Sequence, residues 1–194
     1  LNIDCNKTGL LADWRAMAYR LDELTEDVRI AMVGKYTDLS DAYLSVIKSL
    51  QHAAIAVERK LTIDWIEASD LENAKNSESW DLLRNANGIL VPGGFGDRGI
   101  EGKILAAQYA RENNVPYLGI CLGLQVATIE FCRNVLGITD ATSTEFDSDA
   151  ANPAVIFMPE ISKTHLGGTM RLGSRPTIFQ VDYCVMKRLY DGQD

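Results

Sequence analysis

A strand-to-helix junction in the middle of the chain constrains its fold more than any other feature. The run Val115–Ile120 is short, apolar and rich in strand-forming residues, and from Leu122 onward apolar residues recur every three or four positions, as on one face of a helix. Cys121 stands at the junction with glycines on either side, in the pattern Gly-x-Cys-x-Gly of residues 119–123. This pattern is the cysteine counterpart of a nucleophile elbow, a sharp turn that presents a reactive side chain at the end of a strand.

Two interpretations of Cys121 compete. A free cysteine at a tight turn is often a small buried apolar residue without a chemical role. At an elbow, however, the glycines leave room for a strained turn, and the positive end of the following helix favours the thiolate over the thiol. Because both glycines and the change of period occur together, we interpret Cys121 as a nucleophile.

The bulk composition argues against several classes of protein. The chain has 194 residues, of which 46% are hydrophobic, and this suits one domain with a sizeable core. A net charge of −8 and a pI of about 4.8 argue against a nucleic acid as partner. No apolar run approaches the roughly 18–20 residues that span a bilayer, and no secretory signal opens the chain, so we expect no membrane segment. Leu1 in place of methionine suggests part of a longer polypeptide.

The cysteines give no sign of a metal site. Cys5, Cys121, Cys132 and Cys184 lack Cys-x-x-Cys spacing, and only two histidines accompany them. We therefore expect neither a bound metal nor a disulfide framework, and a cytoplasmic location.

Strand and helix patterns alternate through the first part of the chain. Residues 1–27 hold an amphipathic helix over 10–21 and a polar break, and we expect them to be a linker from a preceding domain. Strands are expected at 28–33, 61–65, 88–91 and 115–120, and helices at 43–57, 104–111 and 122–133. This alternation predicts an α/β domain over residues 28–194, with a mostly parallel sheet and helices on both faces.

Regular patterns are weaker elsewhere. Residues 70–86 are polar and are expected to hold at most a short helix near 80–83. Strand-like runs occur at 154–158, 168–172 and 177–181, and a short helix is expected at 184–190.

A glycine-rich loop, Pro92–Gly99, follows the third expected strand. Ligands of parallel sheets bind beyond the carboxyl ends of the strands, where this loop and Cys121 both lie. A phosphate loop would need a lysine followed by Ser or Thr, which is absent. Gly94–Gly99 matches a dinucleotide fingerprint formally, but its strand is not the first of a dinucleotide-binding unit. The third interpretation is an oxyanion hole built from backbone N–H groups, and the proximity of Cys121 favours it.

These motifs together resemble a known family. Pro92–Gly96 and Gly119–Gln125 resemble the two signatures of class I glutamine amidotransferases. Four further runs resemble the glutaminase domain of the CTP synthase family: Gly34–Tyr36, Ser40–Tyr43, Ser143–Phe146 and Gly167–Gly173. The resemblance extends from about residue 10 to residue 190 and implies a three-layer, flavodoxin-like α/β fold with a mostly parallel sheet.

The resemblance implies a role for each matching residue. Cys121 would attack the side-chain amide of L-glutamine and form a γ-glutamyl thioester, while the backbone N–H groups of Gly94 and Leu122 hold the oxyanion. Gln125 and Glu145 would bind the amino-acid end of the substrate, with the Glu145 carboxylate paired to its ammonium. The implied glutamine-binding residues are Gly94, Phe95, Leu122, Gln125 and Glu145.

The resemblance also implies partners. The family joins this domain to a synthetase domain that uses Mg²⁺ and ATP to aminate UTP to CTP, with GTP as allosteric activator. Arg98 and Arg171 match positions associated with GTP activation and with communication to the synthetase domain. We expect no cofactor in the domain itself and a homo-oligomer for the full-length protein.

One part of the family pattern is missing from this sequence. Class I enzymes supply their base as His-x-Glu, with a nearby arginine that binds the substrate carboxylate, and neither motif is present. His52 falls in an expected helix, where a packing role is favoured, and His165 precedes Leu166 and Gly167 and does not replace the pair. We expect the natural polypeptide to continue beyond Asp194.

Two other functions remain open from the sequence. A flavodoxin-like binding or regulatory module would keep the elbow without hydrolysing glutamine. An amidotransferase domain of another synthetase is the other alternative, against which Ser143–Phe146 and Gly167–Gly173 speak.

Overall fold

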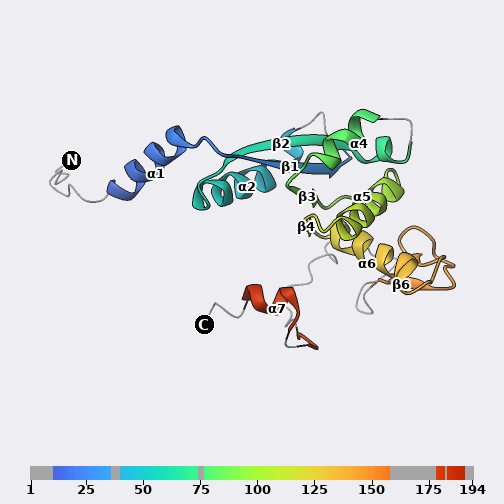
Figure 1. The fold of residues 1–194 in the computed structure, drawn as a ribbon. Helices are drawn as coiled ribbons and strands as arrows, with labels where there is room; N and C mark the ends of the chain where they lie inside the picture. The colour runs from blue at the N-terminus through green and yellow to red at the C-terminus, as the bar shows by residue number, and fades with distance from the viewer. Residues whose placement is uncertain (1–10, 36–39, 74–76, 158–177, 182, 191–194) are drawn as a thin grey trace, which may run out of the picture. The chain divides into compact units, whose positions relative to one another are not determined.

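The chain divides into two compact units, Leu1–Ile156 and Phe157–Asp194, which are described separately. The computed structural model describes residues 11–35, 40–73, 77–157, 178–181 and 183–190 (Figure 1). None of the helices in these ranges is both long enough and apolar enough to span a membrane.

Four parallel strands form the central sheet of the first unit. They are β1 (Asp27–Gly34), β2 (Lys60–Glu67), β3 (Gly88–Val91) and β4 (Tyr117–Gly119), in the spatial order β2-β1-β3-β4. The four strands expected up to residue 120 are therefore confirmed. Their order is that of a flavodoxin-like sheet, in which ligands bind where the strand order reverses, here between β1 and β3.

The helices that follow β1, β3 and β4 in the chain complete an α/β layer structure. They are α2 (Leu44–Ala56), α5 (Ile100–Glu112) and α6 (Leu122–Asn134). The connection through α2 leads from β1 to β2 at one edge of the sheet, and the connection through α5 leads from β3 to β4 at the opposite edge. Because parallel crossovers are right-handed, α2 and α5 cover opposite faces of the sheet, as the sequence predicts.

The centre of the sheet is buried, which fixes the loops that leave it. β3 is buried along its whole length, and Ala31 and Val33 of β1 have 0% of their surface exposed. Val126 and Ile129 of α6 belong to the same buried cluster. Each buried valine or isoleucine contributes roughly 1.5–3 kcal/mol to folding. The carboxyl ends of β1 and β3 are therefore held firmly where the glycine-rich loop begins.

The polar segment between β2 and β3 contains more helix than the sequence predicts. α3 (Ala68–Leu71) was not expected, and α4 (Ser77–Arg84) is longer than the short helix predicted near residues 80–83. A Cβ atom on Gly102 would lie 1.7 Å from the Ala68 carbonyl oxygen, so α3 lies against the backbone of α5. This close packing, which the local sequence does not reveal, explains the extra helix.

The strand predictions after α6 are only partly correct. β6 (Pro153–Val155) overlaps the first predicted run and pairs in parallel with β5 (Thr142–Ser143), which was not predicted. The prediction of a strand over 177–181 is wrong for residues 178–181, and the run 168–172 lies outside the described residues. In the second unit, α7 (Val185–Tyr190) confirms the short helix expected at 184–190.

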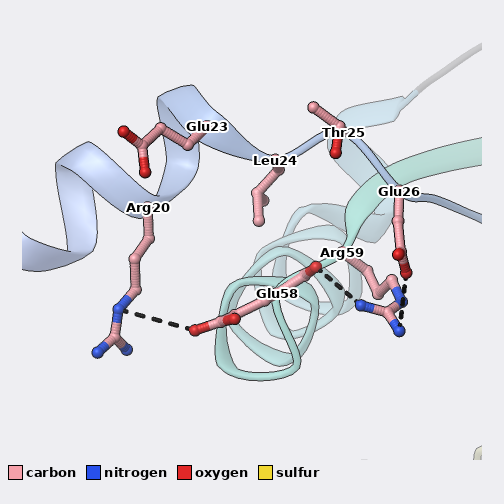
Figure 2. A pocket seen from close by; sticks show the side chains of 7 residues that line it. All are labelled: Arg20, Glu23, Leu24, Thr25, Glu26, Glu58 and Arg59. Carbon is pink, nitrogen blue, oxygen red and sulfur yellow. Dashed lines mark hydrogen bonds and ion pairs between the residues drawn. The ribbon is translucent and has the colours of Figure 1, made fainter.

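The helix α1 (Ala12–Glu23) precedes the sheet and contains no buried residue. A hollow of about 330 Å³ lies between the end of α1 with the segment after it and the loop between α2 and β2. Figure 2 shows the side chains that line it. Two ion pairs border it: Arg20 lies 3.9 Å from Glu58, and Arg59 lies 3.0 Å from Glu26. Both pairs are exposed and therefore weak, and only the first involves α1. The division into a linker over 1–27 and a domain over 28–194 stays a prediction.

Candidate active site

Cys121 occupies a strained turn between β4 and α6. Its backbone dihedral angles are φ 55° and ψ −109°, and it is the residue that precedes the first turn of the helix. A left-handed φ is uncommon for a residue with a Cβ atom and occurs mostly at functional sites. The thiol is free and the residue is exposed to solvent. The predicted elbow is therefore present, with an accessible sulfur at its tip.

The two glycines of the elbow are required by close backbone contacts. A Cβ atom on Gly119 would lie 2.4 Å from the carbonyl carbon of Gly123, and one on Gly123 would lie 2.0 Å from the carbonyl oxygen of Val91. No side chain fits at such distances. The first turn of α6 thus lies directly on the end of β3, and the N–H of Ile120 donates to the Val91 carbonyl at 3.0 Å.

A tyrosine hydroxyl fixes the same turn from the other side. Tyr117 donates a hydrogen bond to the Gly123 carbonyl oxygen at 2.7 Å. Burial raises the pKa of Tyr117 well above its usual value, and the negative charge of Glu130 raises it further. The hydroxyl therefore stays protonated and remains a donor at any physiological pH.

The glycine-rich loop lies against the elbow. A Cβ atom on Gly93 would lie 3.9 Å from the sulfur of Cys121, and one on Gly94 would lie 3.7 Å from a side-chain methyl of Leu122. The structure thus brings together Gly94, Cys121 and Leu122, the three residues that sequence analysis assigns to catalysis. The aim of the Gly94 and Leu122 amides at an oxyanion stays a prediction.

Basic side chains hold the glycine-rich loop in place, and sequence analysis did not assign this role to any of them. The Lys35 ammonium donates to the Phe95 carbonyl at 2.9 Å, which links the loop after β1 to the loop after β3. The Arg98 guanidinium donates to the Lys35 carbonyl and lies 3.5 Å from Glu67 at the end of β2. The site therefore bridges the point where the strand order reverses.

A buried lysine lies behind the loop. Lys103 of α5 is 1% exposed, and its ammonium nitrogen lies 3.7 Å from the position that a Cβ atom on Gly94 would occupy. Burial lowers the pKa of Lys103, the charges of Lys35 and Arg98 lower it further, and that of Glu67 opposes the shift. The available sequence signal was a lysine among the apolar residues of a helix face.

Comparisons with known proteins agree with this geometry. A family model described as Glutamine amidotransferase class-I matches residues 38–193. The chain belongs to the class I glutamine amidotransferase family. Among its curated relatives is the CTP synthase of Dictyostelium discoideum, 60% identical over 179 residues that cover 87% of this chain and 32% of that protein. The CTP synthase of Eremothecium gossypii is 57% identical over 192 residues, which cover 93% of this chain and 33% of that protein.

A solved structure supports the same assignment at the level of the amidotransferase fold. The glutaminase domain of Trypanosoma brucei CTPS with bound acivicin matches with a TM-score of 0.66 and 45% sequence identity. The match covers 71% of this chain and 53% of that chain. The chain spans about a third of the length of the curated relatives it matches.

The roles of the substrate-binding residues that the amidotransferase resemblance implies stay predictions, and the structure gives their positions. Gln125 is half-buried in the first turn of α6, and its N–H donates to the Cys121 carbonyl at 3.1 Å. Glu145 is exposed in the turn after β5, and its backbone N–H donates to the Ser143 hydroxyl oxygen at 3.2 Å. Phe95 is 66% exposed beside the elbow loop. Their contacts with glutamine stay predictions.

The remaining predicted residues divide into those the structure describes and those it does not. His52 is exposed on α2, so the expected packing role is wrong. Arg98 is exposed beside the site, and its role toward GTP stays a prediction. Arg171 and His165 lie outside the described residues.

Proposed function

We propose that this chain hydrolyses L-glutamine at Cys121 and supplies ammonia to a CTP synthase, as its glutaminase domain. The observation that carries the proposal is the exposed Cys121 thiol on a strained elbow, with Gly93 against its sulfur. The CTP synthase relatives and the acivicin-bound glutaminase domain support the choice of glutamine as substrate.

The reaction divides into two steps at one sulfur atom. The Cys121 thiolate attacks the side-chain carbonyl carbon of glutamine, a C–S bond forms, and the carbonyl oxygen takes the negative charge. The amides of Gly94 and Leu122 donate to that oxygen; one such donor contributes roughly 100- to 1000-fold in rate. The C–N bond then breaks, nitrogen takes up a proton and leaves as ammonia, and water hydrolyses the thioester to glutamate.

The proton transfers need a base, which the family supplies as a histidine oriented by a carboxylate. His52 is the histidine within the described residues, and it is exposed on α2. We therefore assign the base to a residue outside the described part of the polypeptide. Among the described residues, no group of three or more His, Cys, Asp or Glu could hold a metal ion.

The whole-protein partners follow from the same proposal. The ammonia would reach a synthetase domain of the same polypeptide, which uses Mg²⁺ and ATP to aminate UTP. Arg98 and Arg171 would carry the response to GTP, and the full-length protein would be a homo-oligomer. The free thiols of Cys121, Cys132 and Cys184 fit a reducing cytoplasm.

Covalent labelling tests the nucleophile. The full-length protein is treated with acivicin or with 6-diazo-5-oxo-norleucine, a glutamine analogue with an electrophilic carbon, and the modified peptide is identified by mass spectrometry. We expect a single adduct on Cys121 that the Cys121→Ala variant lacks. Cys132, a half-buried cysteine on the same helix, provides an internal control. Labelling of Cys132 instead, or of no residue, contradicts the assignment.

A turnover assay separates the glutaminase from a binding module. The glutaminase releases glutamate from glutamine, and with UTP and ATP the full-length protein forms CTP. A flavodoxin-like binding module would bind glutamine without releasing glutamate. Glutamate release without CTP formation would favour a partner other than a CTP-forming synthetase.

A further inference from the structure

Lys103 is a buried cation that the mechanism above does not use. It lies in the first turns of α5, where its backbone N–H donates to the Gly99 carbonyl at 3.1 Å. Side chains of helices lean toward the helix N-terminus, and here the side chain of Lys103 runs to Gly94 in the loop after β3. The charged end of a long side chain is thus enclosed directly behind the glycine-rich loop, with 1% of the residue exposed.

The surroundings of Lys103 do not favour a charge on structural grounds. Two other cations, Lys35 and Arg98, act on its ammonium group, against one acid, Glu67, which also lies 3.5 Å from Arg98. Taking an ammonium out of water costs several kcal/mol, and apolar residues of similar volume often replace buried charges with no loss of stability. A methionine would fill the same space, so packing alone does not explain a lysine here.

The chemistry at Gly94 offers an explanation. Its N–H is the proposed donor to the oxygen that becomes negative during attack by Cys121. A positive charge enclosed 3.7 Å from the position of a Cβ atom on Gly94 acts through a medium of low dielectric constant, where it is screened much less than in water. Preorganised positive charge of this kind lowers the energy of a developing oxyanion more than that of the neutral amide.

We propose that Lys103 is a positioning residue of the oxyanion hole: its enclosed ammonium supports the Gly93–Gly94 loop from behind and adds positive potential where the substrate oxygen becomes negative. This inference rests on the proposed glutaminase function. Lys103 touches neither the substrate nor the sulfur and acts through Gly94.

The test compares Lys103→Met with a matched control in the full-length protein. Lys48→Met removes one charge from an exposed lysine of α2, whose ammonium donates to the Gln51 side chain at 3.1 Å. For each protein we measure kcat and KM for glutamine, the melting temperature, and the inhibition constant of glutamate γ-semialdehyde. This aldehyde accepts the Cys121 sulfur at its carbonyl carbon, so its oxygen takes the place of the oxyanion.

Loss of the Lys103 charge should reduce the stabilisation of the oxyanion and leave the binding of the neutral substrate unchanged. We expect kcat to fall about tenfold, less than the loss of a direct donor, with KM little changed and the aldehyde bound about tenfold more weakly. Lys48→Met should match wild type. If Lys103→Met does not fold, Lys103→Gln is measured in the same way.

Two results overturn the inference. One is an unchanged kcat and aldehyde affinity in Lys103→Met. The other is an equal rise in the KM for glutamine and in the inhibition constant of the aldehyde, together with a lower melting temperature, which indicates a structural role only. Wild-type protein that neither hydrolyses glutamine nor binds the aldehyde would overturn the proposed function as well, so the two failures are distinguishable.

Discussion

Cys121 combines an exposed thiol with a backbone conformation that favours glycine. At φ 55° and ψ −109° its Cβ atom is crowded by the neighbouring peptide groups. Residues in such conformations cost of order 1–3 kcal/mol each and persist because the surrounding structure holds them. Here the hydrogen bond from Ile120 to Val91 and the contact of Gly123 with β3 hold the turn.

At position 121, glycine should therefore give a more stable fold than alanine. Glycine adopts a positive φ without the Cβ crowding, so we expect Cys121→Gly to be about 1 kcal/mol or more harder to unfold than Cys121→Ala. Both variants lack the sulfur, and only alanine keeps the Cβ atom, so their difference isolates the strain. Urea unfolding followed by circular dichroism measures it. Equal stabilities would show that the turn is unstrained.

The elements around the elbow tolerate no added bulk. α6 crosses the end of β3 at Gly123, where a Cβ atom would lie 2.0 Å from the Val91 carbonyl oxygen. Alanine is favoured over glycine inside a helix by about 1 kcal/mol, but a contact this short forces the helix away from the strand. The clash outweighs the helix preference.

The expected result for Gly123→Ala is a loss of about 2–3 kcal/mol of unfolding free energy and loss of acivicin labelling at Cys121. Gly137→Ala is the control: that glycine has a φ of 74° and no atom within 4 Å of an added Cβ. It should lose only about 1 kcal/mol, through backbone strain, and should keep the labelling. Normal labelling in Gly123→Ala would contradict the close approach.

A partly buried ion pair joins α5 to α6. The Arg111 guanidinium lies 2.7 Å from Glu130, whose side chain is 3% exposed, and 3.3 Å from Glu112, whose side chain is 50% exposed. The hydrogen bond to Glu130 raises the pKa of Arg111, and the charge of Glu130 adds to it. The two carboxylates share one partner, and Glu130 is both the more buried and the one that accepts hydrogen bonds from two nitrogens of Arg111.

Removing the Arg111 guanidinium should therefore lower the free energy of unfolding through its effect on Glu130 alone. We expect Arg111→Met to lower the unfolding free energy by about 2–3 kcal/mol, because it leaves a buried carboxylate without its cation. Glu112→Gln should change it by less than about 0.5 kcal/mol, because exposed pairs contribute little. Chemical unfolding of both variants checks this. Similar losses in the two variants would show that burial does not set the contribution.

Elements whose sequence signal is local were predicted, and elements that depend on contacts between distant residues were not. β3 was predicted with its bounds because Gly88–Val91 is an apolar run between polar residues and a proline. Such a run is a sufficient sequence signal for a strand that is buried on both faces. The elbow was predicted because its glycines and cysteine are neighbours in the chain. α3 was missed because its reason is a contact with Gly102, more than thirty residues later.

The same distinction applies to the site. Gly94 and Cys121 were assigned together because both follow strands of a parallel sheet, and topology alone brings such loops to one edge. Lys103 was missed because a lysine in a helix usually lies at the surface, although the residues on its face of the helix are apolar. Tertiary burial, which periodicity does not reveal, separates the two cases.

At the scale of the whole molecule, the buried charge behind the loop links function to stability. The pKa of Lys103 in the folded chain lies below its ordinary value of 10.5, chiefly because of burial. The folded chain therefore binds this proton less tightly than the unfolded chain. Between the two pKa values the unfolded chain holds more protons, and the free energy of unfolding rises with pH.

The comparison of wild type with Lys103→Met isolates this effect. At about pH 7 the variant should be the more stable, by about 1 kcal/mol or more, because it avoids the enclosed charge. As the pH rises toward 10.5 the wild-type lysine loses its proton in the folded chain, so the advantage of the variant should shrink. In the unfolded chain Tyr117 also titrates in this range, and its raised pKa in the folded chain lowers stability as the pH rises, but this effect is common to both proteins and cancels. Urea unfolding at about pH 7 and about pH 10 measures the change.

The opposite result would be a variant that is less stable than wild type at neutral pH, with a difference that shrinks as the pH rises. It would show that Lys103 and Glu67 form a net stabilising pair and that the charge of Lys103 needs no functional explanation.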